Sequence, residues 1–341
     1  MKIGLTADLH VSVDRLDDFK LLFKDLATLA VEQDLDAMYF LGDMWHEKHT
    51  VDSQVLNLIY NGGKAIPCEC VWIRGNHEVE LKSHPHQRSY ISLFDSVYRV
   101  ISAKHELIYR LDDGLSLWGL PWFIPEELKK RVAWIAKQPG RKLLFSHTAV
   151  NEGFVSASNS YRPETGVKLA DLHPDLFAMI LLGDYHISQI LGDNVLYLGT
   201  PIPLAHGDKE HGIWVLELGT GKEELVPVNL PSVYPQFITY DFCNDNQLGS
   251  IDYNPYNYNK FIVPQDSVGK LQKMYGGGPK DTWEIIVPET APNSYRARAT
   301  QDELSTPVLA FEKWLKIRGL FGDKDLHTLG LEYLNRHKIG K

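Results

Sequence analysis

The first 75 residues switch between two spacings of apolar side chains. Runs of strand length that are wholly or largely apolar lie at residues 2–7, 37–41 and 70–73. Between them, residues 15–32 and 54–62 carry apolar side chains at three- and four-residue spacing, which is typical of helices that bury one face. Strands that alternate with helices usually form a parallel sheet covered by helices, so this order predicts an α/β fold.

Beyond residue 98 the strand-like runs follow one another more closely. Strands are predicted at residues 116–120, 142–146, 178–182, 195–198, 213–218 and 224–228. A turn at Gly219-Thr220-Gly221 joins the last two as a hairpin. Two packed sheets with helices on the outside accommodate this order.

The composition changes around Pro231 and Pro235. Residues 236–295 are rich in Tyr, Asn, Pro and Gly and predict a small α+β module, whereas two short amphipathic helices are predicted after residue 299. The predicted domain boundaries are 1–230, 235–295 and 300–338.

A short polar motif follows each of five predicted strands. The motifs are Asp8-Leu9-His10, Gly42-Asp43, Gly75-Asn76-His77-Glu78, Ser146-His147 and Gly183-Asp184-Tyr185-His186. The carboxyl ends of parallel strands meet at one edge of a sheet, so these side chains should converge there. Oxygen and imidazole ligands suit Mn²⁺, Fe²⁺ or Zn²⁺, and two such cations assist hydrolysis of phosphoesters by activating water and neutralising charge. The sequence therefore predicts a dinuclear metal site.

This ordered set of motifs resembles that of the calcineurin-like metallophosphoesterases. The resemblance implies a four-layer αββα sandwich with two metals at its rim. It further implies that one metal is bound by Asp8, His10, Asp43 and His186, and the other by Asp43, Asn76, His147 and Asp184, with Asp43 bridging. His77 corresponds to the family's histidine that is not a ligand and that protonates the leaving oxygen or stabilises the transition state.

The last motif departs from the family pattern at Asp184. The family usually has Gly-His-x-His, and this chain has Gly183-Asp184-Tyr185-His186. A carboxylate adds one negative charge, which should strengthen cation binding and favour Mn²⁺, with Mg²⁺ as the alternative. The same change can lower activity.

Two further segments are similar to those of the SbcD-type nucleases, which include bacteriophage recombination proteins. They are Leu120-Pro121-Trp122 and the run from Tyr197 to Asp208, which contains Gly199-Thr200-Pro201. The resemblance implies a DNA exonuclease and endonuclease with a catalytic domain over 1–230 and a capping domain over 235–295. It further implies that the C-terminal helices over 300–338 dock on an SbcC-type coiled-coil ATPase. It also implies a homodimer through the catalytic domain, for which the helical surface near residues 54–60 is a candidate.

The net charge of −9 restricts how DNA could be held. Proteins that bind nucleic acid through their general surface are usually basic, because neutralising phosphates supplies most of the non-specific affinity. This chain would need local basic patches, bound cations or a partner. Candidates close to the Gly-Asn-His-Glu motif are Arg74, Lys82, His84, His86 and Arg88.

Two features point to the cytoplasm, which would be that of the host for a phage protein. No apolar run approaches the roughly 20 residues of a membrane helix, so no membrane association is expected. Cys68, Cys70 and Cys243 form no disulfide framework.

Two other functions stay open. The first is a phosphoesterase that acts on phosphoproteins, cyclic nucleotides or nucleotide-linked metabolites. The second is a scaffold protein whose metal site is degenerate, for which Asp184 is the motivating residue.

Overall fold

The computed structural model describes most of the chain up to residue 286. The described residues are 1–48, 50–79, 90–154, 165–206, 208, 212–219, 223–242, 253–264, 268–275 and 283–286. The helices predicted after residue 299 lie outside this part of the chain, as do residues 82–88 and most of the turn at 219–221.

The first sheet holds the N-terminal strand in its interior. Its order is β12 (Glu224–Val228), β11 (Ile213–Glu217), β1 (Lys2–Thr6), β2 (Ala37–Leu41), β3 (Glu69–Ile73) and β4 (Arg99–Ile101). Strands β1 to β4 are parallel, whereas β11 pairs antiparallel with both β1 and β12. The antiparallel pairing of β11 with β12 agrees with the predicted hairpin.

The second sheet has the same number of strands. Its order is β5 (Glu106–Arg110), β6 (Ser116–Leu120), β7 (Lys142–His147), β8 (Met179–Gly183), β10 (Val195–Tyr197) and β9 (Gln189–Leu191). Strands β6, β7, β8 and β10 are parallel, and the two edge strands are antiparallel to their neighbours.

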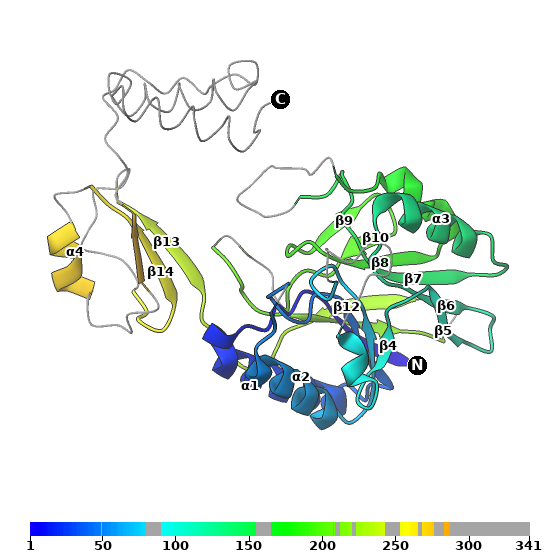
Figure 1. The fold of residues 1–341 in the computed structure, drawn as a ribbon, viewed down its shortest axis with the longest axis horizontal. Helices are drawn as coiled ribbons and strands as arrows, with labels where there is room; N and C mark the ends of the chain where they lie inside the picture. The colour runs from blue at the N-terminus through cyan, green and yellow to red at the C-terminus, as the bar shows by residue number, and fades with distance from the viewer. Residues whose placement is uncertain are drawn as a thin grey trace, which may run out of the picture.

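The two sheets pack face to face and each carries helices on its outer face (Figure 1). Tyr39 of β2 and Phe145 of β7 share the core between the sheets. Phe40 packs in a second core with α1 (Leu16–Glu32) and α2 (Ser53–Ala65), and Leu144 packs in a third with α3 (Pro125–Ala136). Because both faces of the central strands are buried, their sequences are apolar without alternation. The predicted α/β fold with a four-layer αββα sandwich is confirmed.

Short 3-10 helices complete the connections, and none of the described helices is long and apolar enough to cross a membrane. The 3-10 helices are η1 (Val13–Arg15), η2 (Ile91–Phe94), η3 (Leu169–Leu172) and η4 (Pro174–Leu176).

A third sheet lies beside the sandwich, at the left of Figure 1. It contains the parallel strands β13 (Phe237–Asp241), β14 (Tyr258–Ile262) and β15 (Trp283–Ile286), with α4 (Val268–Tyr275) between the last two in the chain. Its core is formed by Phe242, Phe261, Val263 and Leu271. The domain boundaries at 230, 235 and 295 stay a prediction.

The connection between the sandwich and the third sheet is fixed to α1 by one carboxylate. Asp25 is buried and accepts hydrogen bonds from Ser232 N (3.0 Å), Ser232 Oγ (2.8 Å) and Tyr234 Oη (2.7 Å). These contacts close a loop of more than 200 residues and hold the start of the third sheet's segment against the helix.

Replacing Asp25 with Ala should lower the free energy of unfolding by about 2–4 kcal/mol. Three donors would lose a charged acceptor, and such hydrogen bonds contribute roughly 1.5–3 kcal/mol each before the structure relaxes. Urea denaturation would measure the loss, and Asp25→Asn, which keeps one acceptor oxygen, should lose about half as much. A free energy for Asp25→Ala within 0.5 kcal/mol of wild type, roughly the scatter expected of surface substitutions, would contradict the role of Asp25.

Candidate metal centre

The predicted site residues meet where the carboxyl ends of the two sheets converge. Asp8 and His10 follow β1, Asp43 follows β2, and His147 ends β7. Asn76 and His77 follow β3, while Asp184 and His186 follow β8. Both sheets therefore contribute, and their packing sets the spacing of the polar groups.

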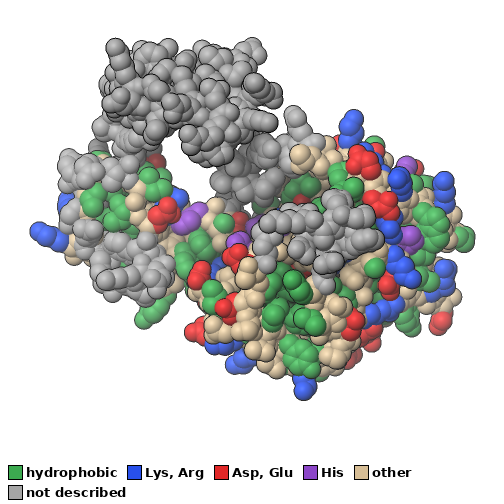
Figure 2. Space-filling view, viewed as in Figure 1, with side chains coloured by type: hydrophobic (Ala, Val, Ile, Leu, Met, Phe, Trp, Pro, Cys, Tyr) green, Lys and Arg blue, Asp and Glu red, His purple; other side chains and the backbone are tan. Residues whose placement is uncertain are grey.

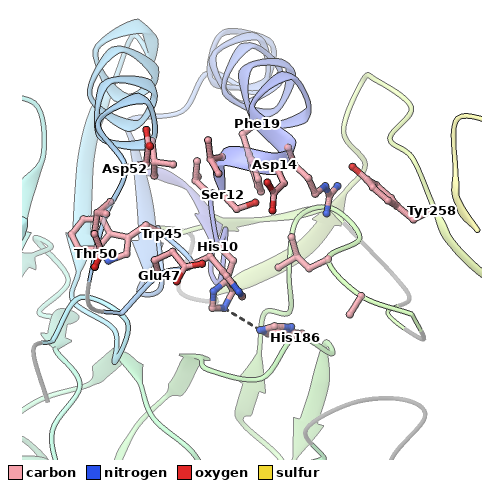
Figure 3. Close-up of a pocket in the computed structure, with 18 of the residues that line it drawn as sticks. His10, Ser12, Asp14, Phe19, Trp45, Glu47, Thr50, Asp52, His186 and Tyr258 are labelled. Carbon is pink, nitrogen blue, oxygen red and sulfur yellow. Dashed lines mark hydrogen bonds between the residues drawn. The ribbon is translucent and has the colours of Figure 1, made fainter. Parts of the chain in front are cut away.

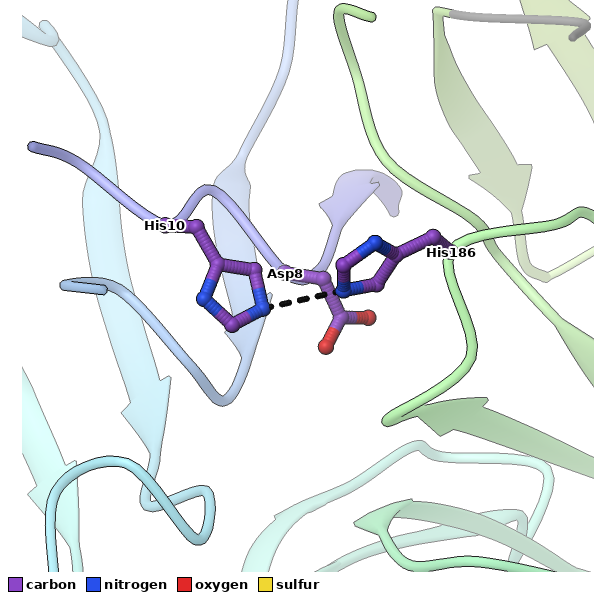
Figure 4. Close-up of side chains that lie close together, drawn as sticks. All are labelled: Asp8, His10 and His186. Atoms are coloured by element: carbon purple, nitrogen blue, oxygen red, sulfur yellow. Dashed lines mark hydrogen bonds between the residues drawn. The ribbon is translucent and has the colours of Figure 1, made fainter. Parts of the chain in front are cut away.

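Among the described residues, three groups of side chains are close enough to hold a cation. They are Asp8, His10 and His186; His10, Asp43 and His77; and Asp8, Asp43 and His147. The donor atoms within each group lie within 4.8 Å of one another. Figure 4 shows the first group, with both imidazole rings turned toward the Asp8 carboxylate.

Asp43 lies at the centre of the cluster. Its Oδ1 is 3.4 Å from His147 Nε2, and its Oδ2 is 3.7 Å from both His10 Nε2 and His77 Nε2. Asp184 Oδ1 is also 3.4 Å from His147 Nε2. Asp43 thus occupies the position that a bridging carboxylate requires.

The second group of donors adds one side chain that the predicted ligand sets exclude. His77 shares a possible cation position with His10 and Asp43. Its Nδ1, however, faces the carbonyl oxygen of His46, and its backbone N donates to Asp43 Oδ1 at 2.9 Å. His77 is therefore held at the rim of the cluster with only Nε2 facing inward.

Two of the predicted ligands have buried atoms suited to a cation. His147 Nδ1 donates to the carbonyl oxygen of Leu41 at 2.7 Å, so its Nε2 is the ring atom that faces Asp43 Oδ1 and Asp184 Oδ1, each 3.4 Å away. Asn76 Oδ1 is buried and has no hydrogen-bond partner among the described residues. Both residues are predicted ligands of the same cation, which would satisfy the lone pair of an oxygen that lacks a hydrogen-bond donor.

The paired imidazoles of His10 and His186 fit a second cation. Their Nε2 atoms lie 3.1 Å apart, and burial lowers the pKa of both rings below the usual histidine range. If both rings are neutral, at most one of the two Nε2 atoms can carry a hydrogen that points at the other. Since metal–nitrogen bonds are about 2.0–2.1 Å long, neighbouring ligands of one cation lie at about this separation.

The ionisable side chains of the cluster shift one another's pKa. Burial would raise the pKa of Asp43, but His147, His10 and His77 together hold it well below the usual value. Burial raises the pKa of Asp8 well above its usual value. Burial alone would lower the pKa of His147, yet Asp43, Asp184 and Asp8 raise it well above the usual range. The buried carboxylates and imidazoles therefore interact strongly with one another.

Four of the predicted ligands have left-handed backbone conformations. The φ angles are 53° at Asp8, 49° at His10, 52° at Asp43 and 107° at Asp184, and only two other non-glycine residues of the described chain have positive φ. Such conformations cost roughly 1–3 kcal/mol each and concentrate at functional sites. The backbone conformations of these loops therefore cost local stability, and they orient the side chains toward the cluster.

The glycines before the ligands are explained by close approach. Gly42 has a φ of 89°, and a Cβ there would lie 2.2 Å from His147 Nδ1. A Cβ at Gly183 would lie 2.2 Å from the carbonyl oxygen of Leu41, the acceptor that orients His147. These glycines let two loops pack directly on the histidine.

Comparison with known proteins agrees with this geometry. The family described as calcineurin-like phosphoesterase matches residues 1–188. The chain belongs to the calcineurin-like phosphoesterase family. This membership supports a metal-dependent phosphoester hydrolase, and the cluster of Asp and His side chains suits two divalent metals.

Solved structures align with this calcineurin-like phosphoesterase at low identity. A dimetal phosphatase from Danio rerio aligns with a TM-score of 0.41 at 12% identity, over 67% of this chain and 98% of that chain. GAP50, described as the anchor in the inner membrane complex of Plasmodium, aligns with a TM-score of 0.45 at 10% identity, over 68% of this chain and 89% of that chain. No curated protein matches the sequence.

Glu78 is a site residue to which the sequence motif assigned no role. Its buried carboxylate accepts from Asp43 N (3.0 Å), Met44 N (2.7 Å) and Gly75 N (2.6 Å). Burial, followed by the nearby Asp43 carboxylate, raises the pKa of Glu78 to about 7. Glu78 ties the loop after β3 to the loop that carries Asp43.

The Gly199-Thr200-Pro201 segment supports the loop that carries His186. Thr200 N donates to the carbonyl oxygen of His186 at 3.1 Å, and a Cβ at Gly199, whose φ is 76°, would lie 2.7 Å from Ser188 N. The segment therefore contacts the backbone of His186, a predicted ligand, and helps to hold it in place.

The structure contradicts the role considered for Arg74. This side chain is 2% exposed and donates to the carbonyl oxygen of Trp122 at 2.6 Å, while Trp122 N donates back to Arg74 O at 2.8 Å. Arg74 thus links the ends of β3 and β6 inside the protein and is not available to the DNA backbone. Lys82, His84, His86 and Arg88 lie outside the described residues.

Proposed function

We propose that this phosphoesterase is an SbcD-type nuclease subunit that hydrolyses phosphodiester bonds in DNA together with an SbcC-type coiled-coil ATPase. The observation that carries the proposal is the metal cluster combined with the Gly199-Thr200-Pro201 segment against the His186 loop. That segment resembles the nucleases in sequence.

In this proposal the residues of the site would bind the two cations and transfer a proton. Asp8, His10, Asp43 and His186 would hold one cation, and Asp43, Asn76, His147 and Asp184 the other. Two bound divalent cations would lower the pKa of water and neutralise charge on the attacking and leaving oxygens. A side chain would then transfer a proton to the departing oxygen.

We propose His77 for that proton transfer. In hydrolysis a water oxygen bonds to phosphorus, the bond from phosphorus to the 3′ oxygen breaks, and the departing oxygen takes up a proton. His77 Nδ1 is engaged by the carbonyl oxygen of His46, so Nε2, 3.7 Å from Asp43 Oδ2, is the atom that would exchange the proton.

The surface charge favours a partner for DNA binding. On the face shown in Figure 2, Lys and Arg side chains are interspersed with Asp and Glu. An ATPase that supplies DNA-binding surface would compensate for the net charge of −9. A homodimer would use α2, where Tyr60 is 37% exposed.

A nuclease assay tests the proposal. Linear duplex DNA should be cut in Mn²⁺ by the wild-type protein with the ATPase, and Asp43→Ala and His77→Ala should each lose most of the activity. Wild-type protein that cuts no faster than either variant would refute it.

The charge near the metals favours one alternative, a phosphoesterase that acts on smaller substrates. Asp14, Glu47 and Asp52 line the cavity beside His10 and would repel a polyanion. A panel of small phosphodiesters discriminates: high turnover on them with none on DNA would favour this alternative.

Asp184→His should change the metal preference. Exchanging a carboxylate for an imidazole removes one negative charge and supplies the ligand that suits Zn²⁺ better than Mn²⁺. We expect Mn²⁺ to bind about tenfold more weakly relative to Zn²⁺, an effect of the size seen when the surroundings of a metal site change. Competition titrations on both proteins measure this ratio, and an unchanged ratio would mean that Asp184 is not a ligand.

A further inference from the structure

A cavity of about 1050 Å³ connects the metal centre with the third sheet (Figure 3). His10 and His186 line it on the side of the sandwich, and Phe237 and Tyr258 line it on the side of β13 and β14. Histidine side chains are visible at this hollow in Figure 2. A substrate larger than a single phosphoester would therefore meet the third sheet on its way to the metals.

Arg15 fills the junction between the two sides. Its guanidinium carbon lies 5.6 Å from the ring centre of Phe19 in α1, 5.3 Å from that of Phe237 and 5.0 Å from that of Tyr258. The rings of Phe237 and Tyr258 are stacked 4.4 Å apart. One buried cation is thus shared by aromatic rings of the sandwich and of the third sheet, an arrangement that gains from desolvation.

Hydrogen bonds fix the orientation of this guanidinium. Arg15 Nε donates to Asp18 Oδ2 at 2.8 Å, and Arg15 Nη1 donates to the carbonyl oxygen of Pro203 at 2.6 Å. The side chain is only 9% exposed. Pro203 belongs to the run that begins at Gly199-Thr200 behind His186, so Arg15 contacts three parts of the cavity wall.

A second contact from the same loop reinforces the junction. The His206 ring lies edge-on to Phe237 at 5.2 Å, and its Nδ1 is 3.1 Å from Thr239 Oγ1. These contacts reach only one edge of the third sheet, whereas Arg15 reaches both β13 and β14. Arg15 is therefore the side chain of this junction that contacts two strands of the third sheet.

We infer that Arg15 is a positioning residue that holds the third sheet beside the metal centre and so determines which sizes of phosphodiester reach the metals. The inference rests on the proposed phosphodiesterase activity. Arg15 touches no reacting atom in this scheme: it acts through Phe237, Tyr258 and Pro203. Lysine cannot replace it, because an ammonium group lacks the planar face and the second hydrogen-bonding nitrogen.

A distance measurement tests the position of the sheet without using activity. Spin labels would be placed at the exposed positions of Lys24→Cys in α1 and Lys273→Cys in α4, with the native cysteines replaced by alanine. We expect a narrow distance distribution in the protein with Arg15 and a clearly broader one for both Arg15→Ala and Arg15→Lys. Lys20→Ala, which removes an exposed ion pair on the same helix, is the matched control and should leave the distribution narrow.

Kinetics with three substrates then test the consequence for substrate size. The substrates are bis(p-nitrophenyl) phosphate, the p-nitrophenyl ester of thymidine 5′-phosphate, and duplex DNA. In Arg15→Ala, the KM should rise for the largest substrate that the wild-type protein cleaves. This rise should be at least about tenfold greater than the rise in KM for the smallest substrate, and kcat should change less than KM. Tyr258→Leu, which removes the ring that stacks beside Arg15, should behave as Arg15→Ala.

The outcomes separate the two proposals. Wild-type protein that cleaves the two small diesters but not DNA would refute the nuclease proposal. The thymidine ester would then be the largest substrate cleaved, and the change in its KM relative to that of bis(p-nitrophenyl) phosphate would still test the role of Arg15. A narrow distance distribution together with equal changes of KM for all substrates would overturn the inference about Arg15. If Arg15→Ala does not fold, Tyr258→Leu supplies the same test from the side of the third sheet.

Discussion

Replacing Asp43 with Asn should lower kcat/KM for phosphodiester hydrolysis by at least about a thousandfold. Asp43 is the one carboxylate within 3.7 Å of three imidazole nitrogens of the cluster, and both of its oxygens face histidines. Metal ions supply several kcal/mol of transition-state stabilisation, and each 1.36 kcal/mol is worth a factor of ten in rate. An amide keeps the shape of the side chain but has no negative charge to balance the charge of two cations.

Metal analysis beside the rate measurement locates the cause of this loss. We expect about two divalent ions per wild-type chain and at most one in Asp43→Asn, with the fold unchanged by circular dichroism. Asp95→Asn, at an exposed position outside the site, is the control for removing a carboxylate. An Asp43→Asn protein that keeps two ions and more than a tenth of the activity would rule out Asp43 as the shared ligand.

Replacing Glu78 with Gln should destabilise both the fold and the metal centre. The carboxylate accepts three backbone hydrogen bonds, two of them at Oε2. The amide nitrogen of glutamine would face at least one backbone N–H, and a buried donor without an acceptor costs roughly 1–3 kcal/mol. Because Asp43 N is one of the donors, the loop that carries Asp43 should lose its orientation, and metal affinity should fall about 10- to 100-fold.

Calorimetric titration of metal and chemical denaturation together measure the two effects. Glu69→Gln, a half-exposed glutamate on β3 close in sequence, provides the comparison and should change neither quantity appreciably. If Glu78→Gln weakened folding without weakening metal binding, the carboxylate would support the loops but not the position of Asp43.

The sandwich could be predicted from the sequence because its central strands are buried on both faces. The segment Ala37–Leu41 is apolar throughout, and such runs between amphipathic helices leave little choice of fold. The strands that the pattern missed, β4, β5, β9 and β13, all lie at the edges of their sheets. Edge strands are short or half exposed, so they show no continuous apolar run.

The side chains that gather in the cluster could be predicted because each ends or follows a strand. The residues that hold them could not, since their partners are distant in sequence. Glu78 binds backbone groups 34 and 35 residues away, and Arg15 binds a carbonyl 188 residues away. Arg74 was wrongly considered a surface cation because the sequence does not reveal that β6 ends beside it.

The pairing of β1 with β11 restricts how the protein can be shortened. β1 lies between β2 and β11, and the register joins Lys2 to Glu217. A fragment that stops at residue 188 would contain the whole metal cluster but would lack β11 and β12. Its first strand, which is largely buried in the whole protein, would become an open sheet edge, the kind of surface through which chains join edge to edge and aggregate. The smallest soluble catalytic fragment must therefore extend at least through Val228, well beyond the last ligand.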